Sequence, residues 1–159
     1  MSSPHQLQIK AALKIQKPAH QVFEAIADPA QMSNYFISKS SGRIEEDKTL
    51  QWQFPEMDMV VPIRVQKVEQ DKFISYEWDD VDGTKTLVQM TLKPVGDNET
   101  FITITEGTKE NNEAGINWLG RNTEGWANFL ACLKAWLEYG INLRKGAFDP
   151  SQMPESTNS

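Results

Sequence analysis

Few side chains in this sequence have the type and spacing that metal or thiol chemistry requires. A metal site needs a cluster of histidine, cysteine or carboxylate ligands, and the chain has only two histidines, His5 and His20. His5 lies near the N-terminus and His20 is predicted to face water in a first helical turn, so we expect no native metal site. Cys132 has Lys134 nearby in the sequence, but the two point in different directions on a helix. We therefore interpret Cys132 as a small core residue rather than a catalytic thiol.

The best candidates for acid–base chemistry lie on one predicted strand and its neighbour. Glu77 or Asp79 could act with Arg64, and Tyr76 carries an inward-facing hydroxyl. The alternation over residues 73–78 turns Glu77 away from the apolar side chains, so we interpret Glu77 and Arg64 as charged residues on a wet sheet face. The glycines form no phosphate-binding loop or dinucleotide motif. We predict no catalytic residue and no cofactor; enzyme activity stays open, with a non-enzyme favoured.

A larger set of bulky apolar side chains favours ligand binding. Its tryptophans and tyrosine carry N–H or O–H groups that need partners when buried, and its methionines suit an adaptable lining. An apolar pocket with a few convergent polar groups is the usual form of a small-molecule site, whereas ordinary core packing is the alternative for the same residues. The candidate cavity-lining residues are Trp52, Phe54, Met59, Tyr76, Trp78, Met90, Trp118, Trp126, Phe129 and Leu130.

The C-terminal members of this set lie on one predicted helix. From about residue 114 to residue 143, apolar side chains recur at helical spacing in a stripe so broad that it requires a large partner surface. The stripe contains Leu119, Trp126, Leu130, Leu133, Leu137 and Ile141. About 28 residues at a rise of 1.5 Å would span ~42 Å, enough to cross several strands. Gly120 and Gly125 weaken this helix, so a bend or a start near Asn122 is the alternative.

The rest of the chain is predicted to form strands that present one apolar face to this helix. Residues 8–15 alternate between apolar and polar side chains, which indicates a strand with one buried face. Pro18, Asp28 and Pro29 then predict two short helices, with Asp28 as the N-cap of the second. Further strands are predicted over residues 42–46, 49–54, 60–69, 73–78, 87–93 and 100–106. Short connections favour antiparallel neighbours, and residues 108–117 are predicted to form a long polar loop.

Composition indicates one acidic domain. The chain has 159 residues, of which 39% are hydrophobic, and a net charge of −6. We expect a domain over residues 8–146, a flexible leader over residues 1–7 and a disordered tail over residues 147–159. Negative charge opposes binding to nucleic acid and to anionic membranes. The single cysteine, the lack of a signal-peptide pattern and the lack of a membrane-spanning run predict a cytoplasmic location. We expect a monomer or a dimer.

The predicted order of elements resembles the helix-grip fold of the START-like superfamily (SRPBCC), which includes the birch-pollen allergen family and the polyketide cyclases. Residues 15–29 are similar to that superfamily's first strand–helix junction, and residues 74–78 and 91–100 resemble its middle hairpins. Gly125 and Trp126, followed by Phe129 and Leu130, resemble the terminal helix of the subgroup related to the activator of the heat-shock protein 90 ATPase.

This resemblance covers about residues 8–146 and implies an α+β helix-grip fold. In that fold a curved antiparallel sheet of about six or seven strands wraps around a long C-terminal helix, and two short helices follow the first strand. The resemblance also implies a cavity between helix and sheet that often holds an apolar ligand. Most members of the superfamily are not proven enzymes. Tyr35 stands where many relatives carry a tryptophan.

Three functions remain open from the sequence. The first is binding of a small apolar molecule, lipid-like or aromatic, between sheet and helix, which the bulky lining favours. The second is a protein-interaction domain that acts as a cofactor of a chaperone ATPase, which the subgroup resemblance implies and which would use the acidic surface and residues 108–117. The third is a cavity enzyme of cyclase or hydrolase type, for which Tyr76 is the only inward-facing polar candidate.

Overall fold

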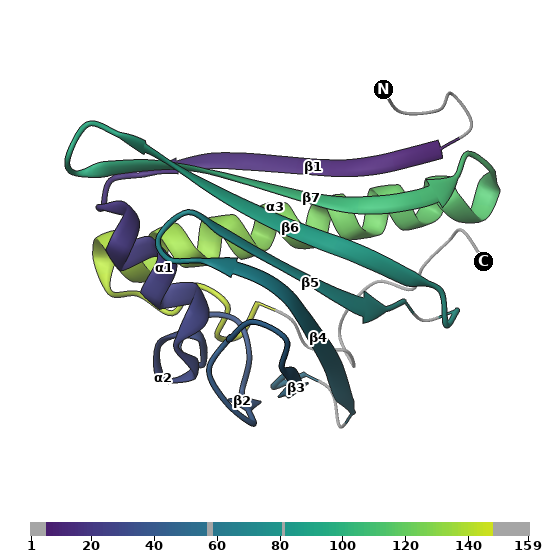
Figure 1. The fold of residues 1–159 in the computed structure, drawn as a ribbon, viewed down its shortest axis with the longest axis horizontal. Coiled ribbons are helices and arrows are strands. Elements are labelled where there is room, and N and C mark those ends of the chain that lie inside the picture. The colour runs from purple at the N-terminus through teal and green to yellow at the C-terminus, as the bar shows by residue number, and fades with distance from the viewer. Residues whose placement is uncertain (1–5, 57–58, 81, 148–159) are drawn as a thin grey trace.

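The computed structural model describes residues 6–56, 59–80 and 82–147. Within them, one antiparallel sheet of seven strands lies against a long helix, and two short helices follow the first strand (Figure 1). The elements are β1 (Gln6–Ile15), α1 (Ala19–Ala27), α2 (Pro29–Met32), β2 (Lys39–Ser40), β3 (Thr49–Gln53), β4 (Val60–Glu69), β5 (Phe73–Asp79), β6 (Lys85–Val95), β7 (Glu99–Glu110) and α3 (Glu113–Tyr139). The predicted α+β helix-grip fold is confirmed.

The strand order of the sheet is β1-β7-β6-β5-β4-β3-β2, with every neighbouring pair antiparallel. Strands β2 to β7 pair in chain order because their connections are too short for a parallel crossover. β1 instead pairs with the last strand, β7, and places Ile15 opposite Thr100. The helix α3 contacts β1 and β7, so the first and last strands form the side of the sheet that rests on it.

The opposite side of the sheet diverges from α3. Figure 1 shows β4 turning away from the helix while β1 and β7 run alongside it. The β4–β5 register shifts between Val65 and Val68, so that two residues of β4 face one residue of β5. A bulge of this kind bends a strand and increases its twist. The N–H of Lys67 in the bulge is satisfied by the hydroxyl of Ser75 at 3.1 Å.

The core lies between the sheet and α3 and consists of side chains that alternate along the strands. Inward-facing sheet residues with at most 4% of their surface exposed include Leu50, Trp52, Ile63, Val65, Ile74, Tyr76, Val88, Met90, Leu92, Ile102 and Ile104. The helix contributes Trp118, Phe129, Leu130 and Leu133 to the same cluster. Burying one such large side chain stabilises a fold by about 1.5–3 kcal/mol. The predicted alternation of the strands is confirmed.

The short helices α1 and α2 pack at one end of this layer, where α1 contacts α3, β6 and β7 (Figure 1). Asp28 is the N-cap of α2, since its Oδ1 accepts the N–H of Ala30 at 2.9 Å and Pro29 takes the first helical position. This cap agrees with the prediction. Tyr35 donates its hydroxyl to the carbonyl of Ala25 at 2.8 Å and so ties the segment after α2 to α1.

Backbone groups at both ends of α3 explain its boundaries. Asn112 is the N-cap, and its side chain accepts the N–H of Gly115 at 2.8 Å. Gly140 ends the helix in the left-handed conformation, with φ of 66°, which a glycine adopts without steric cost. The helix therefore stops before Ile141 and Leu143, which are 53% and 50% exposed. The predicted extension to residue 143 is wrong for this reason.

Two other predicted boundaries are also wrong. The polar loop over residues 108–117 does not exist, because β7 continues to Glu110 and α3 begins at Glu113. The predicted single long helix is confirmed, since α3 is continuous through Gly120 and Gly125 and the alternative start near Asn122 is excluded. The strand predicted over residues 42–46 is replaced by a two-residue strand at Lys39–Ser40.

Both predicted flexible ends lie largely outside the described residues. The leader was expected over residues 1–7, and residues 1–5 are not described. β1 begins at Gln6, which pairs with Glu110, and Leu7 pairs with Lys109. The tail was expected over residues 147–159, of which only Ala147 is described. None of the helices in the described part of the chain is long and apolar enough to cross a membrane.

Gly115 offers a test of how closely α3 packs on the end of β7. A Cβ atom at this position would lie 1.9 Å from the carbonyl oxygen of Glu110. We expect Gly115→Ala to displace the first turn of α3 and to lower the free energy of unfolding by about 2–3 kcal/mol. Urea unfolding followed by circular dichroism measures this loss.

Gly120→Ala is the matched control, since a Cβ at Gly120 meets no atom within 4 Å. It should raise the free energy of unfolding by up to about 1 kcal/mol through helix propensity. If the Gly115 and Gly120 variants were equally stable, the close contact at the start of α3 would not exist.

Candidate ligand-binding site

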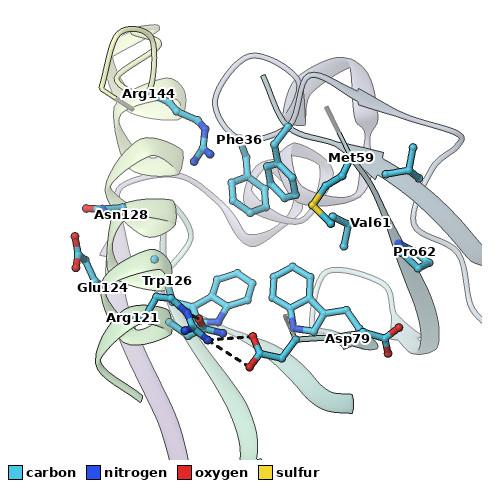
Figure 2. Close-up of a pocket in the computed structure, with 16 residues that line it drawn as sticks. Phe36, Met59, Val61, Pro62, Asp79, Arg121, Glu124, Trp126, Asn128 and Arg144 are labelled. Atoms are coloured by element: carbon cyan, nitrogen blue, oxygen red, sulfur yellow. Dashed lines mark hydrogen bonds and ion pairs between the residues drawn. The ribbon is translucent and has the colours of Figure 1, made fainter. Parts of the chain in front are cut away.

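A pocket of ≈ 660 Å³ opens between α3 and the side of the sheet that diverges from it. Figure 2 shows α3 on one side of this pocket and side chains of β4, β5 and the segments around Phe36 and Met59 on the other. The apolar lining comes mainly from Phe36, Phe54, Met59, Val61, Trp78 and Trp126. The polar lining comes from Asp79, Asp80, Arg121, Asn122, Glu124, Asn128 and Arg144.

Four aromatic side chains form the inner wall of the pocket. Trp78 and Trp126 stack with ring centroids 5.5 Å apart and planes inclined by 28°. Phe36 packs edge-on against Phe54 at 5.2 Å and lies 6.4 Å from Trp126. Aromatic rings present flat apolar surface with few rotatable bonds. The wall therefore suits an apolar or ring-shaped molecule.

A buried carboxylate holds the two indole rings of this wall in place. Glu106 has no exposed surface. Its Oε2 accepts hydrogen bonds from Nε1 of Trp78 at 2.9 Å and from the hydroxyl of Thr86 at 2.6 Å. Its Oε1 accepts from Nε1 of Trp126 at 2.8 Å and from Nδ2 of Asn122 at 3.2 Å. All four of these described partners are neutral donors, an arrangement that satisfies an ionised carboxylate, which only accepts hydrogen bonds.

An ion-pair network closes one end of the pocket. Arg121 of α3 donates to the two carboxylate oxygens of Asp80 at 3.1 and 3.3 Å (Figure 2). Nζ of Lys109 lies 2.5 Å from Asp80 and 3.1 Å from Asp82. Burial lowers the pKa of Lys109, but its bonds to the two carboxylates outweigh burial and raise it. Hydrogen bonds from Thr84, and then from Lys109, hold the pKa of Asp82 well below its usual range.

Arg144 lies at the other end of the pocket and is shared with a second cavity. Its Nε and Nη2 donate to the two oxygens of Glu56 at 3.0 and 2.6 Å, a two-point ion pair. Its guanidinium carbon lies 5.4 Å from the ring centre of Phe36 and 5.8 Å from that of Phe54. The second cavity, of ≈ 680 Å³, has Phe36, Glu56 and Arg144 in its wall. Phe36 and Arg144 therefore separate the two cavities.

The structure divides the predicted cavity-lining residues into two groups. Phe54, Met59, Trp78 and Trp126 line the pocket. Trp52, Tyr76, Met90, Trp118, Phe129 and Leu130 do not line it and are buried in the core cluster. Contact of any of these ten residues with a ligand stays a prediction.

Two of the buried residues carry polar atoms without a partner. Oη of Tyr76 and Nε1 of Trp118 form no hydrogen bond within the described residues. Burial, reinforced by the nearby charge of Glu106, raises the pKa of Tyr76 well above its usual value, so the phenol is neutral. Its ring packs 5.5 Å from Trp52 and 5.4 Å from Trp78. The one inward hydroxyl that the sequence offered to an enzyme thus lies behind the pocket wall.

The acid–base candidates form ion pairs on the outer side of the sheet. Nε of Arg64 lies 3.2 Å from Glu77, and both side chains are 30% exposed. Nη2 of Arg64 lies 2.8 Å from Asp79, and Asp79 also contributes to the rim of the pocket. These contacts agree with the interpretation of Glu77 and Arg64 as charged residues on a wet face.

The histidine and cysteine side chains lie apart from the pocket. His20 is exposed, with Nδ1 3.0 Å from Asp71, which agrees with the predicted water-facing position. Cys132 is buried, and burial raises the pKa of its thiol. Among the residues described, no group of three or more histidine, cysteine, aspartate or glutamate side chains is placed to hold a metal ion.

Glu106, Arg144 and Glu56 were not among the site residues predicted from the sequence. Glu106 had a usable signal, because the inward row Thr100, Ile102 and Ile104 continues to it at the same spacing of two. Arg144 and Glu56 had none, since they are 88 positions apart. A contact of that range depends on how the two segments are brought together in space.

The sequence matches a protein-family model, described as activator of Hsp90 ATPase homolog 1-like protein, over residues 16–138. The chain belongs to this family. The match begins just after β1 and ends one residue before the end of α3, so it includes both sides of the pocket. The resemblance to this subgroup is confirmed. No curated protein matches the chain.

Solved structures share the same architecture. Protein SSP2350 from Staphylococcus saprophyticus is 28% identical, with a TM-score of 0.75 over 87% of this chain and 96% of that one. Aha1 from Colwellia psychrerythraea, solved as a dimer, is 20% identical, with a TM-score of 0.72 over 84% of this chain and 98% of that one. DynU16, from the dynemicin biosynthetic locus, is 21% identical, with a TM-score of 0.74 over 85% of this chain and 48% of that one.

The hydrogen bonds to Glu106 predict a large effect of a small substitution. Glu106→Gln replaces one acceptor oxygen by an NH₂ donor. In either orientation of the amide, this donor faces the indole N–H of Trp78 or of Trp126 and not an acceptor. We expect the free energy of unfolding to fall by about 2–3 kcal/mol, because a buried donor loses its acceptor. Urea unfolding followed by tryptophan fluorescence measures this loss.

Glu124→Gln makes the same chemical change at an exposed position on α3 and serves as the control. Its free energy of unfolding should stay within about 0.5 kcal/mol of wild type. Unaltered stability of Glu106→Gln would show that the four hydrogen bonds do not hold the sheet and helix together.

Proposed function

We propose that the protein binds a small apolar molecule, lipid-like or aromatic, in the pocket between α3 and the diverging side of the sheet. The observation that carries this proposal is the aromatic-walled pocket of ≈ 660 Å³ with polar side chains at its rim. Small-molecule sites typically have volumes of roughly 300–1,000 Å³ and are mostly apolar, with a few polar groups that orient the ligand. The pocket agrees with this description in size and in composition.

The wall of the pocket is held in position before any ligand arrives. Glu106 fixes both indole N–H groups of Trp78 and Trp126. Phe36 is packed against Phe54 and lies 4.6 Å from Phe129 of the core. Because these rings do not have to be ordered on binding, the entropic cost of forming the complex is reduced.

Gly125 leaves the helix side of the pocket open. It lines the pocket, and a Cβ added there would meet no atom within 4 Å. A ligand can therefore approach the backbone of α3 at this point, next to Trp126. A larger side chain at position 125 would occupy this space without disturbing the core.

The open space at Gly125 allows a test of the proposal by substitution. We expect the uncharged fluorescent probe N-phenyl-1-naphthylamine to bind the wild-type protein and to gain fluorescence as it leaves water. Gly125→Leu should weaken its affinity by about tenfold or more, because loss of apolar contact area worth about 1.4 kcal/mol has this effect. A fluorescence titration measures both affinities.

Gly120→Leu is the control, since Gly120 lies on the same helix, also has open space around its Cβ and does not line the pocket. It should bind the probe as wild type does. The proposal fails if wild type binds neither this probe nor any member of a broad lipid panel. It also fails if Gly125→Leu and Gly120→Leu bind equally well. Trp126→Ala is less informative, because it also removes a donor from Glu106.

The family description favours a second candidate, the activation of a chaperone ATPase. The acidic surface stays available for this function, but residues 108–117 do not form the loop that was expected to serve it. We expect a saturating concentration of the protein to raise the ATPase rate of Hsp90 from the same organism if this function holds. An unchanged rate would remove the candidate and would leave the small-molecule proposal unaffected.

A further inference from the structure

The cationic side chains at the two ends of the pocket already have carboxylate partners. Arg121 is bonded to Asp80, which also binds Lys109, and Lys109 in turn binds Asp82. This network contains two cations and two carboxylates. At the other end, the guanidinium of Arg144 is paired with Glu56. Neither end therefore offers a net positive charge to a ligand.

The rim on the sheet side is balanced in the same way. Asp79 lies 2.8 Å from Arg64 and 3.8 Å from Lys85, and Arg64 also contacts Glu77. Figure 2 shows the side chain of Asp79 directed away from the space between the two walls. This group therefore adds no net charge at the rim of the pocket.

Among the described residues, Glu106 is the buried carboxylate that has no cationic partner, whereas Glu124 of the pocket lining is exposed to solvent. All of its described hydrogen-bond partners are neutral, and three of them, Trp78, Asn122 and Trp126, line the pocket. The carboxylate thus lies one side chain behind the aromatic wall. In the low-dielectric interior its field acts on the pocket with little screening by solvent.

The indole rings in front of Glu106 strengthen the preference for positive charge. Tryptophan has the most favourable ring face for a cation, which binds within about 6 Å of the ring centre. Here Trp78 and Trp126 both donate their N–H groups to an anion, and hydrogen bonds of this kind polarise the donor toward a more negative ring. A cation against the pocket side of this indole pair would also lie in the field of Glu106, to which both N–H groups are bonded.

We propose that the ligand carries a positively charged amino group on its apolar body and places this group over the indole rings of Trp78 and Trp126, in front of Glu106. This inference rests on the proposed function, since it names the chemical class of the molecule that the same pocket takes. It assigns to Glu106 a role in selecting the charge of the ligand in addition to its structural role.

A series of three probes with one ring system tests the proposal. Calorimetric titrations of the wild-type protein at neutral pH would compare 1-naphthylmethylammonium, 1-naphthylmethanol and 1-naphthylacetate. We expect the ammonium to bind about tenfold more tightly than the alcohol, and the carboxylate to bind most weakly. Equal affinities for all three would overturn the inference and leave the proposed function intact. Tightest binding of the carboxylate would also overturn it, and would assign selection to Arg121 and Arg144.

Two variants locate the source of the preference. Glu106→Gln removes the buried charge, and the advantage of the ammonium over the alcohol should fall to about twofold or less. Glu113→Gln removes a charge from an exposed position at the start of α3 that does not line the pocket, and should keep the full preference. Circular dichroism confirms that each variant is folded before titration.

The outcomes of this series separate the two proposals. If N-phenyl-1-naphthylamine binds and the ammonium does not, only the inference about charge fails. If neither that probe nor any of the three naphthyl compounds binds, the proposed function fails with it. If Glu106→Gln does not fold, the order of affinities in the wild-type protein still decides the charge preference.

Discussion

The hydrogen bonds to the Glu106 carboxylate join four elements of the fold at one buried point. The carboxylate projects from β7, and its donors come from β5, β6 and α3. A charged group without exposed surface has lost its hydration, and only protein donors in suitable positions offset that cost. The register of the three strands and the position of the helix must therefore agree at this point. The same bonds orient the two indole rings that form the pocket wall, so the stability of the fold and the shape of the site depend on one group.

The pocket follows from the way in which a bent sheet meets a straight helix. α3 rests on β1 and β7, while the bulge in β4 turns the other side of the sheet away from it (Figure 1). Side chains fill the space where the two layers are close, as Trp118 and Leu133 do. Where the layers separate, the aromatic side chains line the space without filling it. One apolar stripe thus belongs to the core over part of its length and to the wall of the pocket over the rest.

Local patterns account for most of the fold. Alternation predicted the inward faces of the strands, and the pair Asp28 and Pro29 predicted the start of α2. The predictions failed where a contact distant in sequence or a glycine cap determines the outcome. The segment after residue 107 is polar and looks like a loop, yet it pairs with β1 and continues β7 to Glu110. Apolar spacing continues to Ile141, but the left-handed Gly140 has already ended the helix.

The sequence by itself determined the α+β architecture, the long amphipathic helix, the apolar faces and the family resemblance, because each depends on a periodicity or a short motif that neighbouring residues contain. Only the tertiary structure decided which aromatic residues reach a pocket, that Glu106 lies under the indole pair, and that Arg144 meets Glu56. Ten bulky side chains with the same local pattern divide into core and lining according to the distance between sheet and helix at each position. That distance is set by the strand bulge and by the packing of α3 on β1, which combine segments from both ends of the chain.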